Sequence, residues 1–373
     1  MIAPVGVAVV GCGFASDFYL ATLAAHPGIR VTALYDRIAE RAERAAERFG
    51  VPVAENLSAL VDREDTLLVV NLTNPAGHAE VTEAALSAGR HVYSEKPLTL
   101  DLAAANRLVK LADSQRLVLA CAPANVLGES IQTLWREIRS GAIGAPRLVY
   151  AELDDGAVHA MRYREWLNDT GVPWPYRDEF EMGCVLEHAG YQLQPLTSMF
   201  GPIRRVAAEA TTVMPDKFPP DESGPLGPDF ATATLTFETG VVARLTCSTV
   251  APKDHSLTVI GDGGVLRLAD CWDFGSPITA RIVGDWEHSY LTRPTPVEPV
   301  RSYTPHEFEY ADHRMDFARG VAEAVEAAVT GRPCRLGAAQ ALHVLEATLA
   351  ISRGESIDIT SEFTPPEPED WAR

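Results

Sequence analysis

The fold of this chain is decided near its start, where Val5 to Ser16 read VGVAVVGCGFAS. The apolar run predicts a buried strand, and Gly11-Cys12-Gly13 predicts a tight turn that opens a helix over residues 17–25. A strand, a glycine turn and a helix N-terminus in this order can cradle a pyrophosphate, because the glycines let the backbone approach it closely. Ser16 stands where the usual fingerprint has glycine or alanine, a mild departure since this position mainly governs helix packing. The sequence therefore predicts a dinucleotide site that includes Gly11, Gly13, Phe14 and Ala15.

An acidic residue, Asp36, ends the next predicted strand, residues 31–35. A carboxylate at this place hydrogen-bonds the adenosine ribose of NAD and disfavours the 2′-phosphate of NADP. Its neighbour Arg37 softens that preference, so we expect NAD as the cofactor, with NADP as the alternative. The competing interpretation is that Asp36 only caps the helix that follows, over residues 38–49.

Strands and helices alternate through the first 122 residues. This rhythm predicts a parallel sheet with right-handed crossovers. We therefore expect an α/β protein whose residues 1–122 form a dinucleotide-binding domain. Its strands are predicted at 5–10, 31–35, 67–72, 91–94 and 117–121.

The pattern changes afterwards, and residues 123–373 are expected to form a second, α+β domain for substrate binding and oligomerisation. Its short strands predict a large, mostly antiparallel open sheet. They lie at 147–153, 205–212, 231–238, 241–249, 256–260, 265–268 and 279–283. Helices are expected at 130–139, 314–330 and 338–352, the last two covering this sheet or returning to the first domain. Residues 214–228 read as a surface loop, and residues 364–371 as an extended acidic tail or oligomer arm.

The composition excludes several classes of protein. A net charge of −19 argues against nucleic acid as a partner, because such binding depends on neutralising phosphates. No apolar run approaches the roughly 20 residues of a membrane helix, so we expect no membrane association. The cysteines are scattered without a CxxC pair, which predicts neither a metal site nor disulfides and favours the cytoplasm. They are Cys12, Cys121, Cys184, Cys247, Cys271 and Cys334.

Two polar segments follow later strands of the first domain. Asn74 and His78 flank the start of a helix, and we expect them to contact the cofactor, although His78 can equally be an ordinary helix residue. Glu95-Lys96-Pro97 follows the strand at 91–94, where a lysine reaches both nicotinamide and substrate. An ammonium beside a reacting hydroxyl stabilises the alkoxide that develops as hydride leaves. The alternative is that Lys96 is an ordinary surface residue.

These segments together resemble the Gfo/Idh/MocA family, named for glucose–fructose oxidoreductase and inositol dehydrogenase. The resemblance is specific over the first 150 residues and looser beyond them. It implies a Rossmann domain, an α/β domain with an open sheet that often forms oligomer interfaces, and NAD(P)-dependent oxidation or reduction of sugars, cyclitols or related alcohols. It also implies that Lys96 is catalytic, that Glu95 lies near the cofactor, and that Asn125 contacts substrate. The matching segments are 11–16, Asp36, 74–78, 88–92, 95–98 and 141–144.

The chain departs from that family in the helix expected around residues 183–192. His188 stands where many members have aspartate, and Gln192 stands where they have histidine. Their spacing of four places both on one helical face, but glutamine can only hydrogen-bond. Three interpretations remain: His188 is the general acid–base group; Lys96 relays the proton, alone or with Tyr191, while His188 and Gln192 orient substrate; or His188 is a buried structural histidine. Glu187 and Tyr191 on the adjoining face are further candidates.

Residues 154–181 are rich in aromatic and arginine side chains. Such side chains suit stacking on a sugar and gripping of a carboxylate or phosphate, and they equally suit a packed loop. We expect His159, Arg162 and Tyr163 to contact substrate in the first case, which favours an NDP-sugar or an acidic sugar.

The sequence therefore predicts a cytoplasmic oxidoreductase that transfers hydride between nicotinamide and a secondary alcohol or ketone of a carbohydrate. A homo-dimer or tetramer through the second sheet is expected. Two alternatives remain: an NAD-dependent enzyme that cleaves glycosidic bonds, and a non-catalytic dinucleotide-binding protein.

Overall fold

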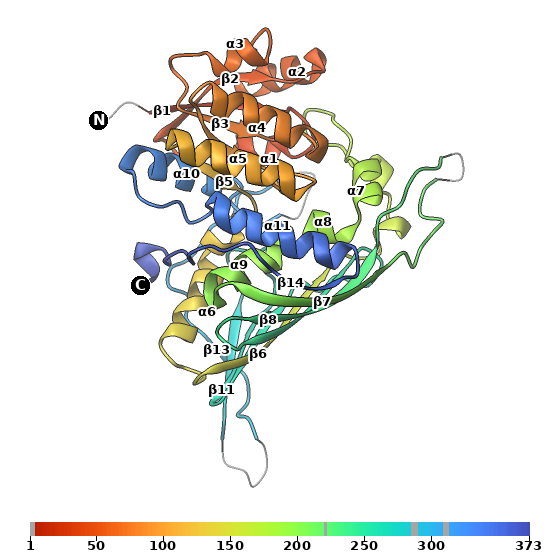
Figure 1. Ribbon diagram of the computed structural model, residues 1–373, viewed down its shortest axis with the longest axis vertical. Helices are drawn as coiled ribbons and strands as arrows, with labels where there is room; N and C mark the ends of the chain where they lie inside the picture. The colour runs from red at the N-terminus through yellow and green to blue at the C-terminus, as the bar shows by residue number, and fades with distance from the viewer. Residues whose placement is uncertain (1–3, 220–221, 285–289, 309–312) are drawn as a thin grey trace.

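The computed structural model describes residues 4–373 except 220–221, 285–289 and 309–312. It contains two sheets, one in each half of the chain, with helices between them (Figure 1). The predicted fold class is confirmed: a Rossmann-type sheet is followed by a large, mostly antiparallel one.

The first sheet has five parallel strands in the order β2-β1-β3-β4-β5. The strand order reverses between β1 and β3. Ligands of open α/β sheets bind at such a place. The strands are β1 (Val5–Val10), β2 (Ile29–Tyr35), β3 (Leu68–Asn71), β4 (His91–Ser94) and β5 (Leu119–Cys121).

Helices connect these strands where the sequence predicted them, with one addition. The short helix α3 was missed because five residues are too few to display a helical period; Asn56 caps it by accepting from the backbone N–H of Ala59. The helices are α1 (Ser16–Leu23), α2 (Ala39–Phe49), α3 (Leu57–Val61), α4 (His78–Ser87) and α5 (Leu102–Gln115).

The second sheet has nine strands in the order β13-β12-β11-β10-β6-β9-β8-β7-β14. Every neighbouring pair is antiparallel except β6 and β9. The strands are β6 (Pro146–Asp154), β7 (Ile203–Thr211), β8 (Phe230–Phe237), β9 (Val242–Ser248), β10 (Leu257–Gly261), β11 (Gly264–Leu268), β12 (Ile278–Ile282), β13 (Thr295–Pro296) and β14 (Ser356–Asp358).

Helix α11 (Ala338–Ser352) joins the two halves, lying between α5 and the second sheet (Figure 1). Its Leu342 and Leu345 pack into the core of the first sheet, whereas Ala347 and Ile351 pack into the core that includes the second. Thus one of the late helices both covers the second sheet and returns to the first domain. The other helices of this half are α6 (Glu129–Arg139), α7 (Tyr176–Met182), α8 (Cys184–His188), α9 (Gly190–Phe200) and α10 (Arg319–Thr330).

Two segments make contacts that the sequence did not predict. The loop at 214–228 is partly internal, because Lys217 is buried and forms an ion pair with Asp229 at 2.8 Å. The tail at 364–371 is not a free arm, since Arg335 donates to the carbonyl of Glu367 and Gln132 accepts from the backbone N–H of Glu369. The contacts of the tail join it to residues far away in the sequence, which local composition does not encode. Within the described residues, no helix combines the length and apolar character needed to cross a membrane.

Candidate active site

The glycine turn after β1 has the shape that a dinucleotide requires. Gly11 has a φ of 98°, and a Cβ there would lie 2.5 Å from the backbone carbon of Leu72. A Cβ on Gly13 would meet no described atom within 4 Å, so the turn is open on that side. Helix α1 begins directly afterwards, and its N-cap residue Ala15 provides no side-chain cap. The residues present therefore fit a pyrophosphate at a helix N-terminus.

Asp36, which directly follows β2, accepts a hydrogen bond from the glycine turn. Its Oδ2 accepts from the backbone N–H of Cys12, and its Oδ1 accepts from that of Ile38, both at 2.8 Å. The N-cap position of α2 is Ile38, so Asp36 links the glycine turn to the start of the helix, the place from which a carboxylate reaches a ribose. Arg37 beside it is exposed.

A loop of the second half closes on the glycine turn, a contact that sequence reasoning missed. The side-chain amide of Asn168 donates to the carbonyls of Gly13 at 3.2 Å and Phe14 at 3.3 Å. Two residues later, the backbone N–H of Thr170 donates to Asp17 at 3.1 Å. These partners lie more than 150 residues apart in the chain, so no local pattern announces them.

His78 supports the loop around Lys96 rather than facing outward. The ring is fully buried, with Nδ1 2.6 Å from the carbonyl of Pro97 and Nε2 2.9 Å from that of Thr73. Burial lowers the pKa of His78, and the contacts with the two carbonyls oppose this only in part. Asn74 is exposed at the start of the same loop and hydrogen-bonds the side chain of Asp178.

Lys96 forms a buried ion pair across the junction of the two halves. Its Nζ lies 2.7 Å from Oε2 of Glu187 on α8, and the side chains are 18% and 6% exposed. Burial lowers the pKa of Lys96, but the negative charge of Glu187 outweighs burial and raises the pKa overall. Lys96 is therefore a permanent ammonium that donates hydrogen bonds.

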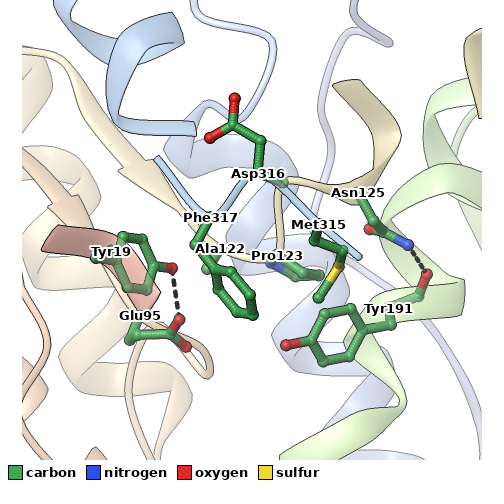
Figure 2. A pocket seen from close by; sticks show the side chains of 10 residues that line it. Tyr19, Glu95, Ala122, Pro123, Asn125, Tyr191, Met315, Asp316 and Phe317 are labelled. Carbon is green, nitrogen blue, oxygen red and sulfur yellow. Dashed lines mark hydrogen bonds between the residues drawn. The ribbon is translucent and has the colours of Figure 1, made fainter. Parts of the chain in front are cut away.

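Glu95 points into a small pocket beside the carboxyl ends of β4 and β5 (Figure 2). Its Oε1 accepts from the hydroxyl of Tyr19 at 2.5 Å, and its Oε2 accepts from the backbone N–H of Lys96 at 2.8 Å. Asn125 lines the same pocket and donates to the carbonyl of Tyr191 at 2.7 Å. Its buried Oδ1 has no hydrogen-bond donor among the described residues. The pocket is lined by Tyr19, Glu95, Ala122, Pro123, Ala124, Asn125, Tyr191, Met315, Asp316 and Phe317.

His188 is buried at the end of α8. Its Nε2 lies 3.6 Å from Oε2 of Glu179 and 3.8 Å from Oδ2 of Asp155. Burial lowers the pKa of His188, and the charge of Asp155 opposes this only in part, so the ring is neutral at pH 7. Burial likewise raises the pKa of Tyr191, whose ring contacts that of Trp272 at a centroid distance of 4.8 Å.

Glu179 on α7 is a residue of this cluster that the sequence did not single out. Burial raises its pKa well above the usual range, and repulsion from Glu187 adds to the effect. Its surroundings therefore favour the protonated form of Glu179 over the ionised one. In the sequence Glu179 looks like the acidic residues beside it, because only burial in the folded protein distinguishes it from them.

Gln192 faces the second sheet. Its amide donates to the backbone carbonyls of Glu152 at 2.9 Å and Ser256 at 3.3 Å, and the side chain is fully buried. Gln192 lies four residues after His188 but on another helix, because the chain breaks at Ala189 between α8 and α9. The amide hydrogens of Gln192 are thus committed to backbone.

The aromatic segment forms a small core of its own. Tyr163 is buried against Phe180 and donates to the carbonyl of Lys217. Arg162 lies at the surface with its side chain 85% exposed, near Glu165. His159 is partly buried. Within the described parts of the chain, no hydrogen bond or ion pair joins these three residues to Lys96 or His188.

Sequence comparison assigns both halves of the chain to one family. Residues 5–122 match the oxidoreductase family with an NAD-binding Rossmann fold, and residues 131–267 match the GFO/IDH/MocA C-terminal domain. A dTDP-3,4-didehydro-2,6-dideoxy-alpha-D-glucose 3-reductase of Streptomyces violaceoruber is 35% identical over 204 residues, 54% of this chain and only 56% of that relative. The enzyme of the same name from Streptomyces antibioticus is 36% identical over 251 residues, 66% of this chain and 69% of that one.

The fold also matches solved structures. A 3-ketoreductase from Actinomadura kijaniata, solved with TDP-benzene and NADP, superposes with a TM-score of 0.71 at 23% identity, covering 94% of this chain and 98% of that one. The resemblance noted in the sequence is thus confirmed over both halves. The chain belongs to the Gfo/Idh/MocA family of oxidoreductases, with an NAD-binding Rossmann domain followed by the family's C-terminal domain.

Proposed function

We propose that this protein transfers hydride between NAD(P) and a secondary alcohol or ketone of a sugar, NDP-sugar or cyclitol. One observation carries the proposal: a permanent ammonium, Lys96, is held by Glu187 where the Rossmann strands end and the second domain begins. An ammonium in a poorly solvated site stabilises the negative charge that develops on a reacting oxygen.

The glycine turn and Asp36 would hold the dinucleotide, and Glu95 would lie near its nicotinamide end. When bound, the dinucleotide supplies the carbon that accepts or donates hydride. Asp36 favours NAD by charge, whereas the exposed Arg37 leaves room for NADP, the cofactor in the solved 3-ketoreductase.

The proton of the substrate hydroxyl needs an acceptor other than Lys96, which already carries its full set of protons. His188 is buried, its pKa is lowered by burial, and it directly follows Glu187 on α8, so it suits this role. Tyr191 is a poor acceptor because its phenol keeps its proton. We therefore assign proton transfer to His188 and substrate polarisation to Lys96.

Two hydrogen-bond acceptors lie at the small pocket beside β4 and β5. Glu95 and the unpaired Oδ1 of Asn125 are hydrogen-bond acceptors for hydroxyl groups. Arg162 is exposed beside Glu165, so its position does not indicate that it binds a substrate phosphate. The names of the Streptomyces relatives nevertheless make dTDP-sugars the first substrates to test.

The test is a panel of dTDP- and UDP-sugars, free sugars and cyclitols, assayed with NAD and NADP by absorbance of the reduced nicotinamide. Turnover that is lost in Lys96→Met supports the proposal. Glycosidic cleavage without net reduced cofactor would favour the glycoside-cleaving alternative. Tight dinucleotide binding without turnover of any compound would instead indicate a non-catalytic binding protein.

A further inference from the structure

A line of charged side chains leads from His188 to the protein surface. Nε2 of His188 lies 3.8 Å from Oδ2 of Asp155, and Oδ1 of Asp155 lies 3.4 Å from Nε2 of His255. Nδ1 of His255 lies 3.4 Å from Oδ1 of Asp270. We call Asp155, His255 and Asp270 the charge chain. They come from three places in the sequence, after β6, before β10 and after β11.

The charge chain is buried at its centre and open at its outer end. The side chain of His255 is fully buried, whereas those of Asp155 and Asp270 are 21% and 32% exposed. The ring of Trp272 packs on His255 at a centroid distance of 4.2 Å. Neither ring nitrogen of His255 has a hydrogen-bond partner among the described residues, so its contacts with the two carboxylates are ionic ones at 3.4 Å.

The electrostatic balance agrees with the geometry. Burial lowers the pKa of His255, but Asp155 and Asp270 outweigh burial and raise it overall. Burial raises the pKa of Asp155, yet His255 and His188 outweigh burial and lower it overall. Asp155 is therefore an anion, and the cation that keeps it ionised is His255.

A second carboxyl group beside His188, that of Glu179, differs from that of Asp155 in the direction of its pKa shift. Glu179 is slightly nearer to Nε2, at 3.6 Å against 3.8 Å for Asp155, but burial and Glu187 raise its pKa. Thus, of two carboxyl groups at similar distances, Asp155 is the one whose ionised form its surroundings favour.

We propose that the charge chain positions His188 and supplies, through Asp155, the negative charge that stabilises its ring when the ring takes up a proton. Asp155, His255 and Asp270 are positioning residues, since they act through His188. The inference deepens the proposed function, because it rests on His188 as the proton acceptor. The other charged or titratable groups around the ring are Lys96 after β4, Glu179 on α7 and Glu187 on α8.

The test measures the titration of His188 directly, by NMR of the full chain labelled at histidine, with signals assigned from single His→Gln variants. Asp155→Asn removes the negative charge while keeping the shape, so the pKa of His188 should fall by about one unit. Glu179→Gln replaces a neutral acid by a neutral amide and should leave the pKa nearly unchanged. Asp154→Asn is the matched control, since its carboxylate instead accepts from the hydroxyl of Ser248.

An unchanged pKa of His188 in Asp155→Asn, or an equal fall in Glu179→Gln, overturns the proposal. If Asp155→Asn does not fold, Asp270→Asn at the more exposed end replaces it. The pKa of His255 should then fall, and an unchanged pKa there overturns the charge chain.

The activity of the same variants separates this inference from the proposed function. A protonated His188 cannot accept a proton, so the acidic limb of kcat/KM should move to lower pH in Asp155→Asn. If the pKa of His188 falls by NMR while the acidic limb stays in place, the charge chain stands and the catalytic role of His188 fails.

Discussion

Nζ of Lys96 and Oε2 of Glu187 lie 2.7 Å apart, although 91 residues separate them in the chain. Lys96 follows a strand of the Rossmann sheet, and Glu187 lies on a helix of the second domain. The pair therefore fixes the position of the ammonium relative to both domains. Breaking a buried pair from one side leaves an uncompensated charge, so each partner depends on the other.

The first prediction concerns the ammonium itself. Lys96→Met keeps much of the side-chain volume and removes the charge, so kcat should fall by about 100-fold, the scale of acid–base catalysis. The affinity for NADH, measured by fluorescence titration, should stay nearly constant because the glycine turn is untouched. Lys110→Met, at an exposed site on α5, is the matched control. Equal kcat in the Lys96 variant and the wild type would refute the central role.

The second prediction follows from the protonated state of Glu179. The pKa of Glu179 is raised in the folded protein. At a pH between its unfolded and folded pKa values, the folded state therefore binds more protons than the unfolded state does. Stability from this group is therefore complete below the unfolded pKa, about 4.3, and declines as pH rises toward the folded pKa. Glu179→Gln mimics the protonated acid and has no proton to lose.

The measurement is urea unfolding of wild type and Glu179→Gln at pH 5 and pH 7.5. The variant should gain stability relative to wild type as pH rises. Glu181→Gln, on an exposed residue of the same helix, is the control. A difference between Glu179→Gln and wild type that is the same at both pH values contradicts the buried neutral acid.

The third prediction concerns cofactor choice. Asp36→Ala removes the carboxylate that would repel a 2′-phosphate, so the ratio of kcat/KM for NADP over NAD should rise by about tenfold, equivalent to about 1.4 kcal/mol. Asp36→Asn keeps an acceptor for the N–H of Cys12 and separates the loss of charge from the loss of that hydrogen bond. An unchanged ratio in both variants would place the ribose elsewhere.

The fourth prediction tests the loop that closes on the glycine turn. Asn168→Ala removes the amide that donates to the carbonyls of Gly13 and Phe14. One hydrogen bond contributes about 1 kcal/mol, so the Kd for NADH should rise by roughly fivefold. Asn106→Ala, whose amide donates to its own helix at an exposed site, should leave Kd unchanged. Identical Kd values for both variants would show that the loop does not support the cofactor turn.

The local features of this protein were predictable. The glycine turn, the βαβ rhythm and the place of Lys96 after β4 all depend on residues that are neighbours in the chain, and hydrophobic periodicity reports such neighbours directly. The segments at 214–228 and 364–371 are a loop and an extended tail as predicted, but the sequence did not reveal their contacts with Asp229, Arg335 and Gln132.

By itself the sequence determined the fold class, the dinucleotide turn and the family. Only the tertiary structure decided the chemical state of the candidate site. It paired Lys96 with Glu187, raised the pKa of Glu179 while lowering that of Asp155, and turned the amide of Gln192 toward the sheet. The physical reason is that charge states depend on burial and on distances of a few ångströms between segments that are remote in the chain.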